Sequence, residues 1–132
     1  MTNHILALGS ALYSRLNSQG TVDIFYGLAP QGQATPYCII QTQSSGVDDY
    51  VFGSTDSSSV SCLYTVKIVD NSNWPTNGWS IYQHIDTALQ GFNLSVTGYS
   101  TLRCNRESSI EYRDEQKFWH VGSLFRIDLE KN

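Results

Sequence analysis

Residues 25–42, FYGLAPQGQATPYCIIQT, join two short apolar segments through small and polar residues bracketed by two prolines. Pro30 and Pro36 push the residues before them toward extended conformations and cannot donate a hydrogen bond to a sheet ladder. Gly27 and Gly32 permit sharp bends. We therefore predict a strand on each side of a semi-rigid loop, which projects from the sheet and cannot close as a tight hairpin.

An amphipathic helix is predicted upstream of this stretch, from a cap at Thr2 or Asn3 to about Asn17. Apolar residues at helical spacing form its core-facing stripe, which consists of Ile5, Leu8, Leu12 and Leu16, widened by Leu6 and Tyr13. Gly20 suits a left-handed C-terminal position and ends the helix.

Downstream, residues 43–59 (QSSGVDDYVFGSTDSSS) are rich in serine and carry an apolar Tyr50-Val51-Phe52 in their middle. Long polar connections in compact domains usually serve a function or are disordered. We predict a long loop or an extended hairpin tip here.

The spacing of apolar residues in the rest of the chain predicts the remaining elements of the fold. We predict strands at residues 22–26, 37–42, 60–69, 99–107 and 118–129. We also predict a helix at residues 76–90 and a charged turn at residues 111–117. The helix buries a stripe of Trp79, Tyr82, Ile85 and Leu89, and the last strand alternates between a core face and a face with His120, Arg126 and Asp128. The expected fold is α+β in the order α-β-β-β-α-β-β: an antiparallel or mixed sheet of about five strands with two helices packed on one face.

Composition limits the function classes. The 132 residues are expected to form a single domain, 1–132. Only 15% of residues are charged and the net charge is −4, which argues against a protein that wraps nucleic acid non-specifically. The N-terminus lacks the pattern of a targeting signal and no segment is apolar enough to span a membrane, so we expect a soluble cytosolic chain. Cys38, Cys62 and Cys104 are expected to be buried reduced thiols.

Catalytic patterns are weak. Ser80 and Ser100 lie in near misses of the nucleophile-elbow pattern, and both lack its second glycine. His84 and Asp86 point in different directions on a helix, and a Cys62–His120 pair across neighbouring strands is weaker than the interpretation of His120 as a surface residue. We predict no enzymatic activity, no catalytic residues and no cofactor.

Two groups of charged residues could bind ions. Asp48 and Asp49, with help from Asp56, could hold a cation, but a solvated acidic loop is favoured because the spacing and glutamate of a calcium site are missing. No metal is predicted. Three arginines could form an anion patch, although such residues more often serve solubility or subunit contacts: Arg103, Arg106 and Arg113.

The opening stretch also carries a family resemblance. The helix ILALGSALYSRLNSQG, the strand VDIFYG, and the loop Ala29-Pro30-Gln31-Gly32 leading to Pro36-Tyr37 resemble the tail-terminator (tail-completion) proteins of long-tailed bacteriophages. The later order of elements is similar too, including a helix that ends in Ala88-Leu89.

The resemblance implies a structural virion protein without catalytic residues. Such proteins form rings, typically hexamers, that cap the finished tail tube, stop its polymerisation and dock to the head-closure or connector protein. DNA passes through the lumen without specific binding, and a net negative charge suits such a lumen. The chain would be assembled in the bacterial host cytoplasm and end in the tail or neck of the virion, without contact with a membrane.

Two segments are predicted to make assembly contacts with a neighbouring subunit or the tube. They are the middle of the serine-rich segment, with Asp48, Asp49, Tyr50, Val51 and Phe52, and the proline loop, with Pro30, Gln31 and Gly32.

Alternative functions remain open from the sequence. The first is another neck component, such as a head-closure or connector-completion protein. The second is a small cytosolic enzyme that uses a cysteine or histidine. A carbohydrate-binding module would need exposed aromatic residues on a platform, whereas Trp74 and Trp79 are expected at the start and in the core side of a helix.

Overall fold

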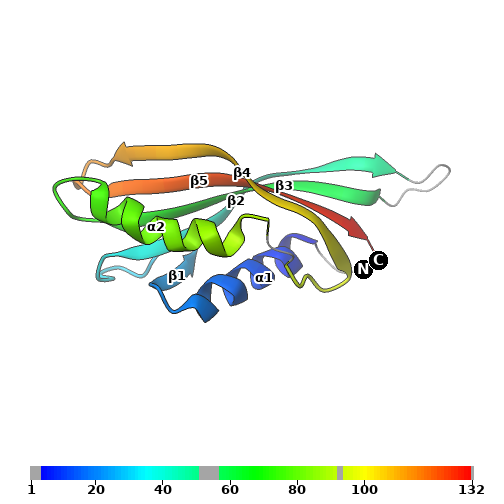
Figure 1. The fold of residues 1–132 in the computed structure, drawn as a ribbon, viewed down its shortest axis with the longest axis horizontal. Helices are drawn as coiled ribbons and strands as arrows, with labels where there is room; N and C mark the ends of the chain where they lie inside the picture. The colour runs from blue at the N-terminus through cyan, green and yellow to red at the C-terminus, as the bar shows by residue number, and fades with distance from the viewer. Residues whose placement is uncertain (1–3, 51–56, 92–93, 132) are drawn as a thin grey trace.

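Seven elements follow one another in the order predicted from the sequence (Figure 1). The computed structural model describes residues 4–50, 57–91 and 94–131. The elements are α1 (His4–Gln19), β1 (Asp23–Tyr26), β2 (Tyr37–Tyr50), β3 (Ser57–Asp70), α2 (Thr76–Leu89), β4 (Tyr99–Arg113) and β5 (Trp119–Lys131).

The strands form one mixed sheet in the spatial order β1-β2-β3-β5-β4. β1 pairs with β2 in parallel, and the other three pairs are antiparallel. Both helices lie on the same side of this sheet, as Figure 1 shows. The predicted fold class is therefore confirmed, with the mixed rather than the purely antiparallel sheet.

The parallel pairing explains the long connection between the first two strands. Asp23 lies opposite Tyr37, so the chain must return to the starting end of β1 before β2 begins. A two-residue hairpin cannot join parallel strands, which need a longer crossover. Residues 27–36 make this return with the backbone of Gly27 and Gly32 at φ values of 80° and 82°. The prediction of a loop that cannot close as a tight hairpin is confirmed.

The core lies between the helices and one face of the sheet. Tyr64 of β3 and Phe125 of β5 lie opposite each other at its centre, and both are fully buried. The alternate residues of these strands are also buried, as are the inward residues of the helices: Leu8, Leu12, Leu16, Val60, Cys62, Val66, Ile68, Tyr82, Ile85, Leu89, Val121, Ile127 and Leu129. The predicted stripes are confirmed at these positions, and Trp79 packs partly buried against the same core.

The three cysteines are buried and form no disulfide bond, as expected. Burial raises the pKa of the Cys38 and Cys104 thiols to about 12. A thiol with so high a pKa carries almost no thiolate at neutral pH and is a poor nucleophile.

The serine-rich segment is where the predicted strand boundaries were wrong. β2 does not end at Thr42 but continues to Tyr50, and β3 begins at Ser57 instead of Val60. Of the two forms predicted for this segment, the described residues show the extended hairpin. Its Ser, Gly and Asp residues lack the alternation that marks a strand, but their backbones still pair, as Ser45 does with Cys62. We call residues 43–50 and 57–59 the arm.

The predicted end of β4 was also wrong. This strand runs to Arg113 instead of residue 107, and the charged turn shrinks to residues 114–118. Most side chains between residues 106 and 113 are exposed on an edge strand, so hydrophobic alternation is absent there. The ladder with β5 nevertheless continues through Tyr112 opposite His120.

The central strands approach each other closely at Gly122. This residue of β5 lies opposite Lys67 of β3. A Cβ atom at Gly122 would overlap the carbonyl oxygen of Val66 and lie 2.5 Å from the Cα of Lys67. Only glycine fits here without moving the backbone of β3.

We expect Gly122→Ala to lower the free energy of unfolding by about 3 kcal/mol or more, because the overlapping atoms are backbone and cannot rotate away. Gly32→Ala is a matched control, since it strains a φ of 82° but has open space around it. That strain costs about 1–2 kcal/mol. Urea denaturation followed by circular dichroism measures both losses, and a smaller loss at Gly122 than at Gly32 would contradict the close approach.

Candidate assembly surfaces

The arm extends beyond the rest of the domain. β1 covers β2 only as far as Ile40, opposite Tyr26. Beyond that point β2 pairs only with β3 among the described residues, through positions such as Gly46 with Ser61 and Asp49 with Ser59. In Figure 1 these two strands project past the helices at the end of the molecule near the N- and C-termini.

The predicted contact residues of this segment are only partly described. Asp48, Asp49 and Tyr50 belong to β2, and the ladder has irregularities between Val47 and Asp49 and between Asp49 and Tyr50. Val51 and Phe52 lie outside the described residues. The predicted contacts of these five side chains therefore stay a prediction.

The arm region is strongly acidic. Residues 43–59 contain Asp48, Asp49 and Asp56 but no lysine or arginine. This segment accounts for three of the four net negative charges of the chain. The rest of the molecule is nearly neutral.

The proline loop lies at the opposite end of the sheet. Pro30, Gln31 and Gly32 are exposed, and a hydrogen bond of 3.1 Å from the Gln33 N–H to the Pro30 carbonyl closes a turn around them. Leu28 in the same loop is 85% exposed. The loop is therefore accessible for contacts, and its role in assembly stays a prediction.

Trp74 also lies on the surface. It precedes α2, as expected, but its side chain is 74% exposed. Trp79 instead donates a hydrogen bond of 2.7 Å to Glu111. The two tryptophans thus differ in exposure and do not form one aromatic platform.

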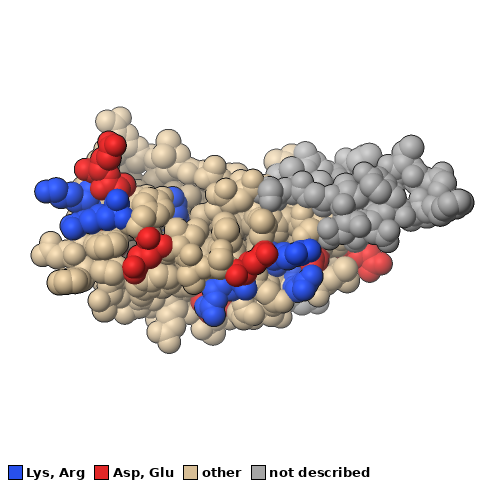
Figure 2. Space-filling model, turned by 90° about the horizontal axis from the view of Figure 1, so that it is seen from above, with Lys and Arg blue, Asp and Glu red and all other residues tan. Residues whose placement is uncertain are grey.

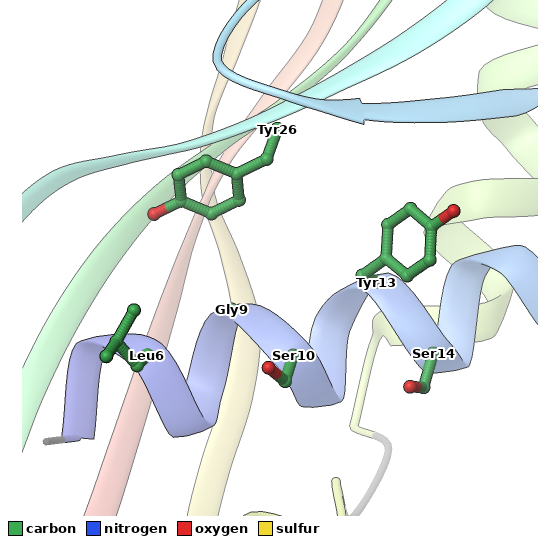
Figure 3. A pocket seen from close by; sticks show the side chains of 6 residues that line it. All are labelled: Leu6, Gly9, Ser10, Tyr13, Ser14 and Tyr26. Carbon is green, nitrogen blue, oxygen red and sulfur yellow. The ribbon is translucent and has the colours of Figure 1, made fainter.

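A shallow apolar groove lies along α1, and sequence reasoning missed it. Leu6 and Tyr13 were predicted to face the core, but they are 70% and 43% exposed. Figure 3 shows them on either side of Gly9, with the ring of Tyr26 from β1 above the helix. The groove has a volume of about 360 Å³, and Ser10 and Ser14 complete its lining. The small residues Gly9, Ser10 and Ser14 between larger apolar ones were the available signal.

The sheet face opposite the helices is uncovered among the described residues. Figure 2 shows this face: its broad middle carries few charged side chains, and the charges of the described residues lie at one end and along one margin. Ile39 and Val69 lie on it but are only 4% and 1% exposed.

A polar cluster at one end of this face ties the β4–β5 turn to the sheet. His120 Nε2 lies 2.7 Å from Asp114 Oδ2, and the imidazole stacks on Tyr112 with ring centroids 4.6 Å apart. Lys67 Nζ donates a hydrogen bond of 2.9 Å to the Tyr112 hydroxyl. We call Lys67, Tyr112, Asp114 and His120 the latch.

Burial controls the charge of the latch histidine. It lowers the pKa of His120 below the ordinary value, although the hydrogen bond with Asp114 acts in the opposite direction. His120 Nδ1 is buried without a hydrogen-bond partner among the described residues, so a proton there would be unsatisfied. At neutral pH the imidazole is therefore neutral, and Nε2–H donates to the carboxylate. Burial would raise the pKa of Asp114, but hydrogen bonds from His120 and the turn backbone outweigh it and lower that pKa.

Three arginines of the β4–β5 pair form ion pairs on two faces of the sheet. Arg103 Nε donates a hydrogen bond of 2.8 Å to Asp128 Oδ2, and Arg126 Nε donates one of 3.3 Å to Asp128 Oδ1. Arg106 forms an ion pair of 3.2 Å with Asp86 of α2. Burial would raise the pKa of Asp128, but the hydrogen bonds from Arg103, Ser61 and Arg126 hold it below its usual range.

The anion patch that the sequence left open, but did not favour, does not form. Arg113 lies at the far end of β4, where its guanidinium is 5.4 Å from the centre of the Trp119 ring. Arg103 lies opposite Asp128, and Arg106 lies opposite Phe125, whose side chain faces the helices. A ladder irregularity between Thr101 and Arg103 and another after Arg106 change the alternation. The three residues therefore do not converge on one site.

The residues considered as weak catalytic candidates do not form a catalytic arrangement in the structure. Cys62 pairs with Ile127 while His120 pairs with Val69, so seven ladder positions, or roughly 23 Å, separate them. Ser80 lies within α2 and Ser100 within β4, so neither occupies a strand-to-helix turn. Among the described residues no group of three His, Cys, Asp or Glu side chains could hold a metal ion. No described helix is both long and apolar enough to cross a membrane.

Comparison with known proteins identifies the fold. The chain is similar to a chain in the solved structure of the virion of a native gene transfer agent particle, with a TM-score of 0.77 and 16% identity over 98% of this chain and 99% of that chain. A second solved structure, named without a functional description, gives a TM-score of 0.71 and 10% identity over 96% and 95% of the two chains. No family model and no curated protein sequence matches the chain. These similarities show a shared fold over nearly the whole length.

Because His120 resists protonation in the folded state, we expect the free energy of unfolding to fall as the pH drops below about 6.5. The unfolded imidazole gains a proton there, whereas the folded one gains it only at lower pH. Urea denaturation at pH 7.5 and pH 5.5 measures this loss. His120→Gln should flatten the dependence, while His84→Gln, at an exposed position, should keep it. Identical pH profiles of wild type and His120→Gln would contradict the role of the latch.

The two leucines near the start of α1 offer a matched test of the groove. Leu8→Ala should lower the free energy of unfolding by about 2–5 kcal/mol, because Leu8 is fully buried. Leu6→Ala should change it by no more than about 0.5 kcal/mol, because Leu6 is mostly exposed. Thermal and urea denaturation compare the two variants. A large loss for Leu6→Ala would restore the original prediction that it packs in the core.

Proposed function

We propose that this protein is a structural component of a phage-like virion and acts as the tail terminator, a ring that caps the tail tube and joins it to the head-closure or connector protein. The observation that carries the proposal is the similarity to a virion chain of a gene transfer agent particle over nearly the full length of both chains. A match of this extent involves the arm and both helices as well as the sheet core.

The surface of the molecule supports an assembly role. It offers several separate contact areas: the arm at one end of the sheet, the proline loop at the other, and the apolar groove along α1. Dissimilar patches on opposite sides of a subunit are what head-to-tail association requires, and such association closes into a ring when its rotation permits. A hexamer is the form that the family resemblance implies.

Its charge also fits a channel through which DNA passes. With a net charge of −4, the chain lacks the basic surface that would hold phosphates. The concentration of acidic residues in the arm would repel a polyanion near it. DNA would then pass without specific binding, and no cofactor or enzymatic step enters this role.

Two alternatives remain. Another neck component, such as a head-closure or connector-completion protein, would have the same fold similarity and would differ in its position in the particle. A small Cys/His enzyme has less support, because its best candidate pair lies far apart along the ladder. The particle would be assembled in the host cytoplasm in either structural role.

The proposal predicts the behaviour of an arm deletion. A variant lacking residues 47–53 should remain a folded monomer that no longer limits tail-tube length, because the arm and its tip are proposed to contact a neighbouring subunit or the tube. Size-exclusion chromatography with light scattering measures the oligomer, and electron microscopy of tubes polymerised with the protein measures their lengths.

A control for this deletion lies at the other end of the sheet. An insertion of Gly-Ser after Glu115, in the exposed β4–β5 turn, should leave ring formation and tube length unchanged. If the deletion variant terminated tubes normally, the arm would have no such role. If the wild-type ring bound the connector but not the tube, the neck-component alternative would replace the terminator.

A further inference from the structure

We infer that the outer edge of β4 binds the same edge of a second copy of this chain, so that two sheets join into one across a two-fold axis. The segment that pairs is residues 107–113, ESSIEYR. This contact is symmetric, whereas the contact in the proposed ring is head-to-tail. The inference therefore goes beyond the proposed function and does not depend on it.

The edge of β4 is covered near its middle and open in its second half. β4 is the last strand in the sheet order and lies at the margin of the sheet in Figure 1. Gly91 N–H donates to the Cys104 carbonyl at 2.7 Å, and Arg106 N–H donates to Gln90 Oε1 at 2.9 Å, so the chain itself covers the edge there. The outer side of residues 107–113 receives no such backbone hydrogen bond from the described part of the chain. Unpaired backbone groups on an exposed edge are a template for a further strand.

The ladder with β5 identifies the backbone groups that point outward. Asp114 N–H donates to the Phe118 carbonyl at 2.9 Å, so these two residues form a hydrogen-bonded pair. Such pairs alternate along an antiparallel ladder, and the register holds without a shift back to Ser108, so Tyr112, Ile110 and Ser108 also bond to β5. The alternate residues direct their N–H and C=O groups away from β5: Ser109, Glu111 and Arg113.

This edge is complementary to itself when two copies run in opposite directions. An antiparallel pair centred on Ile110 places Glu107 of each copy opposite Arg113 of the other. It also places Ser109 opposite Glu111, and both of these residues have outward backbone groups that can bond between the copies. Opposite charges on facing strands stabilise the pair, and the symmetry provides two such ion pairs.

Other registers bring like charges together. A shift of two residues in one direction sets Glu111 opposite Glu111 of the second copy, and a shift in the other direction sets Glu107 opposite Glu111. Like charges directly opposite each other destabilise a strand pair. A shift of one residue would set outward backbone groups against groups that already bond to β5. The charges therefore select one register, with a second copy of this chain as the partner.

The charged side chains of this edge are accessible. Glu107 and Arg113 are exposed, and Glu107 lies at the second irregularity of the β4 ladder, where the regular edge ends. Arg113 Nε donates to the Lys117 carbonyl at 3.1 Å, which leaves the terminal nitrogens of the guanidinium for a carboxylate. Unlike the three arginines paired with Asp128 and Asp86, Arg113 forms no ion pair within the described part of the chain.

A proline at an outward position tests the backbone pairing. Ser109→Pro removes an N–H that points away from β5, and edge strands accept proline at such positions. By symmetry it removes two hydrogen bonds between the copies, so it should weaken their association about tenfold or more. Sedimentation velocity over a concentration series measures association, and the wild type should reach twice the mass of its smallest species. Ser109→Ala keeps the N–H and is the matched control, which should associate like wild type.

Charge reversal with mixing tests the register. Glu107→Arg and Arg113→Glu each set like charges opposite each other and should each weaken association about tenfold or more. Mixed in equal amounts, the two variants should bind each other, because every arginine then faces a glutamate. The chain carrying both changes should also recover self-association. Glu115→Lys lies in the turn outside this edge and controls for altered net charge.

Circular dichroism checks that each variant is folded. If Arg113→Glu unfolds the chain, Arg113→Gln replaces it and should weaken association by loss of the ion pairs. A wild type that never doubles its mass, a Ser109→Pro variant that doubles like wild type, or folded charge variants that do not bind each other in the mixture would overturn this inference. The proposed ring is judged separately: if the wild type forms rings, doubling joins two of them, and Ser109→Pro should return single rings that still cap tail tubes.

Discussion

The antiparallel pairing of β3 with β5 is the constraint on which the rest of the structure depends. Tyr64 and Phe125 meet at its centre without exposure to solvent, and Gly122 lets the two backbones approach closely. Only one face of this pair receives helices, because both amphipathic stripes need the same apolar surface. Each central strand then forms a hairpin with an outer neighbour, β3 with β2 and β5 with β4. These hairpins turn at opposite ends of the sheet, and so the arm and the latch lie at opposite ends.

The parts of this fold that depend on side-chain burial could be predicted from the sequence. Leu8, Leu12 and Leu16 recur at helical spacing, and Val121, Phe125 and Ile127 alternate at strand spacing, so their buried faces follow from the pattern. The same reasoning failed for Leu6 and Tyr13. They lie at the margin of the stripe, where spacing alone cannot distinguish the core from a groove beside it. The strands of the arm were missed because their Ser, Gly and Asp residues lack the hydrophobic alternation that marks a strand.

The candidate assembly surfaces could not be predicted in detail, because they depend on side-chain contacts that residue spacing does not reveal. Arg103 and Arg106 are three residues apart, but the irregularities in the β4 ladder decide that one pairs with Asp128 and the other with Asp86. The latch joins the turn residue Asp114 to His120, whose partner could be recognised only once the β4 boundary was known. The proline loop likewise depends on the pairing of β1 with β2. Because this pairing is parallel, the loop must bring the chain back to the starting end of β1. The two prolines predicted that the loop stays open, but the sequence did not show that it joins parallel strands.

The proposed assembly role would also account for a fold that is retained at low sequence identity. An enzyme must keep particular side chains at its reacting atoms, and these leave a motif that survives divergence. A ring subunit needs a core that holds its shape and opposite patches whose charges match each other, and many sequences satisfy both conditions. The virion chain shares 16% of its residues with this one yet has the same fold along its length. Surface side chains can therefore change while the geometry of the core persists, and such a fold leaves no fixed residue for a sequence comparison to detect.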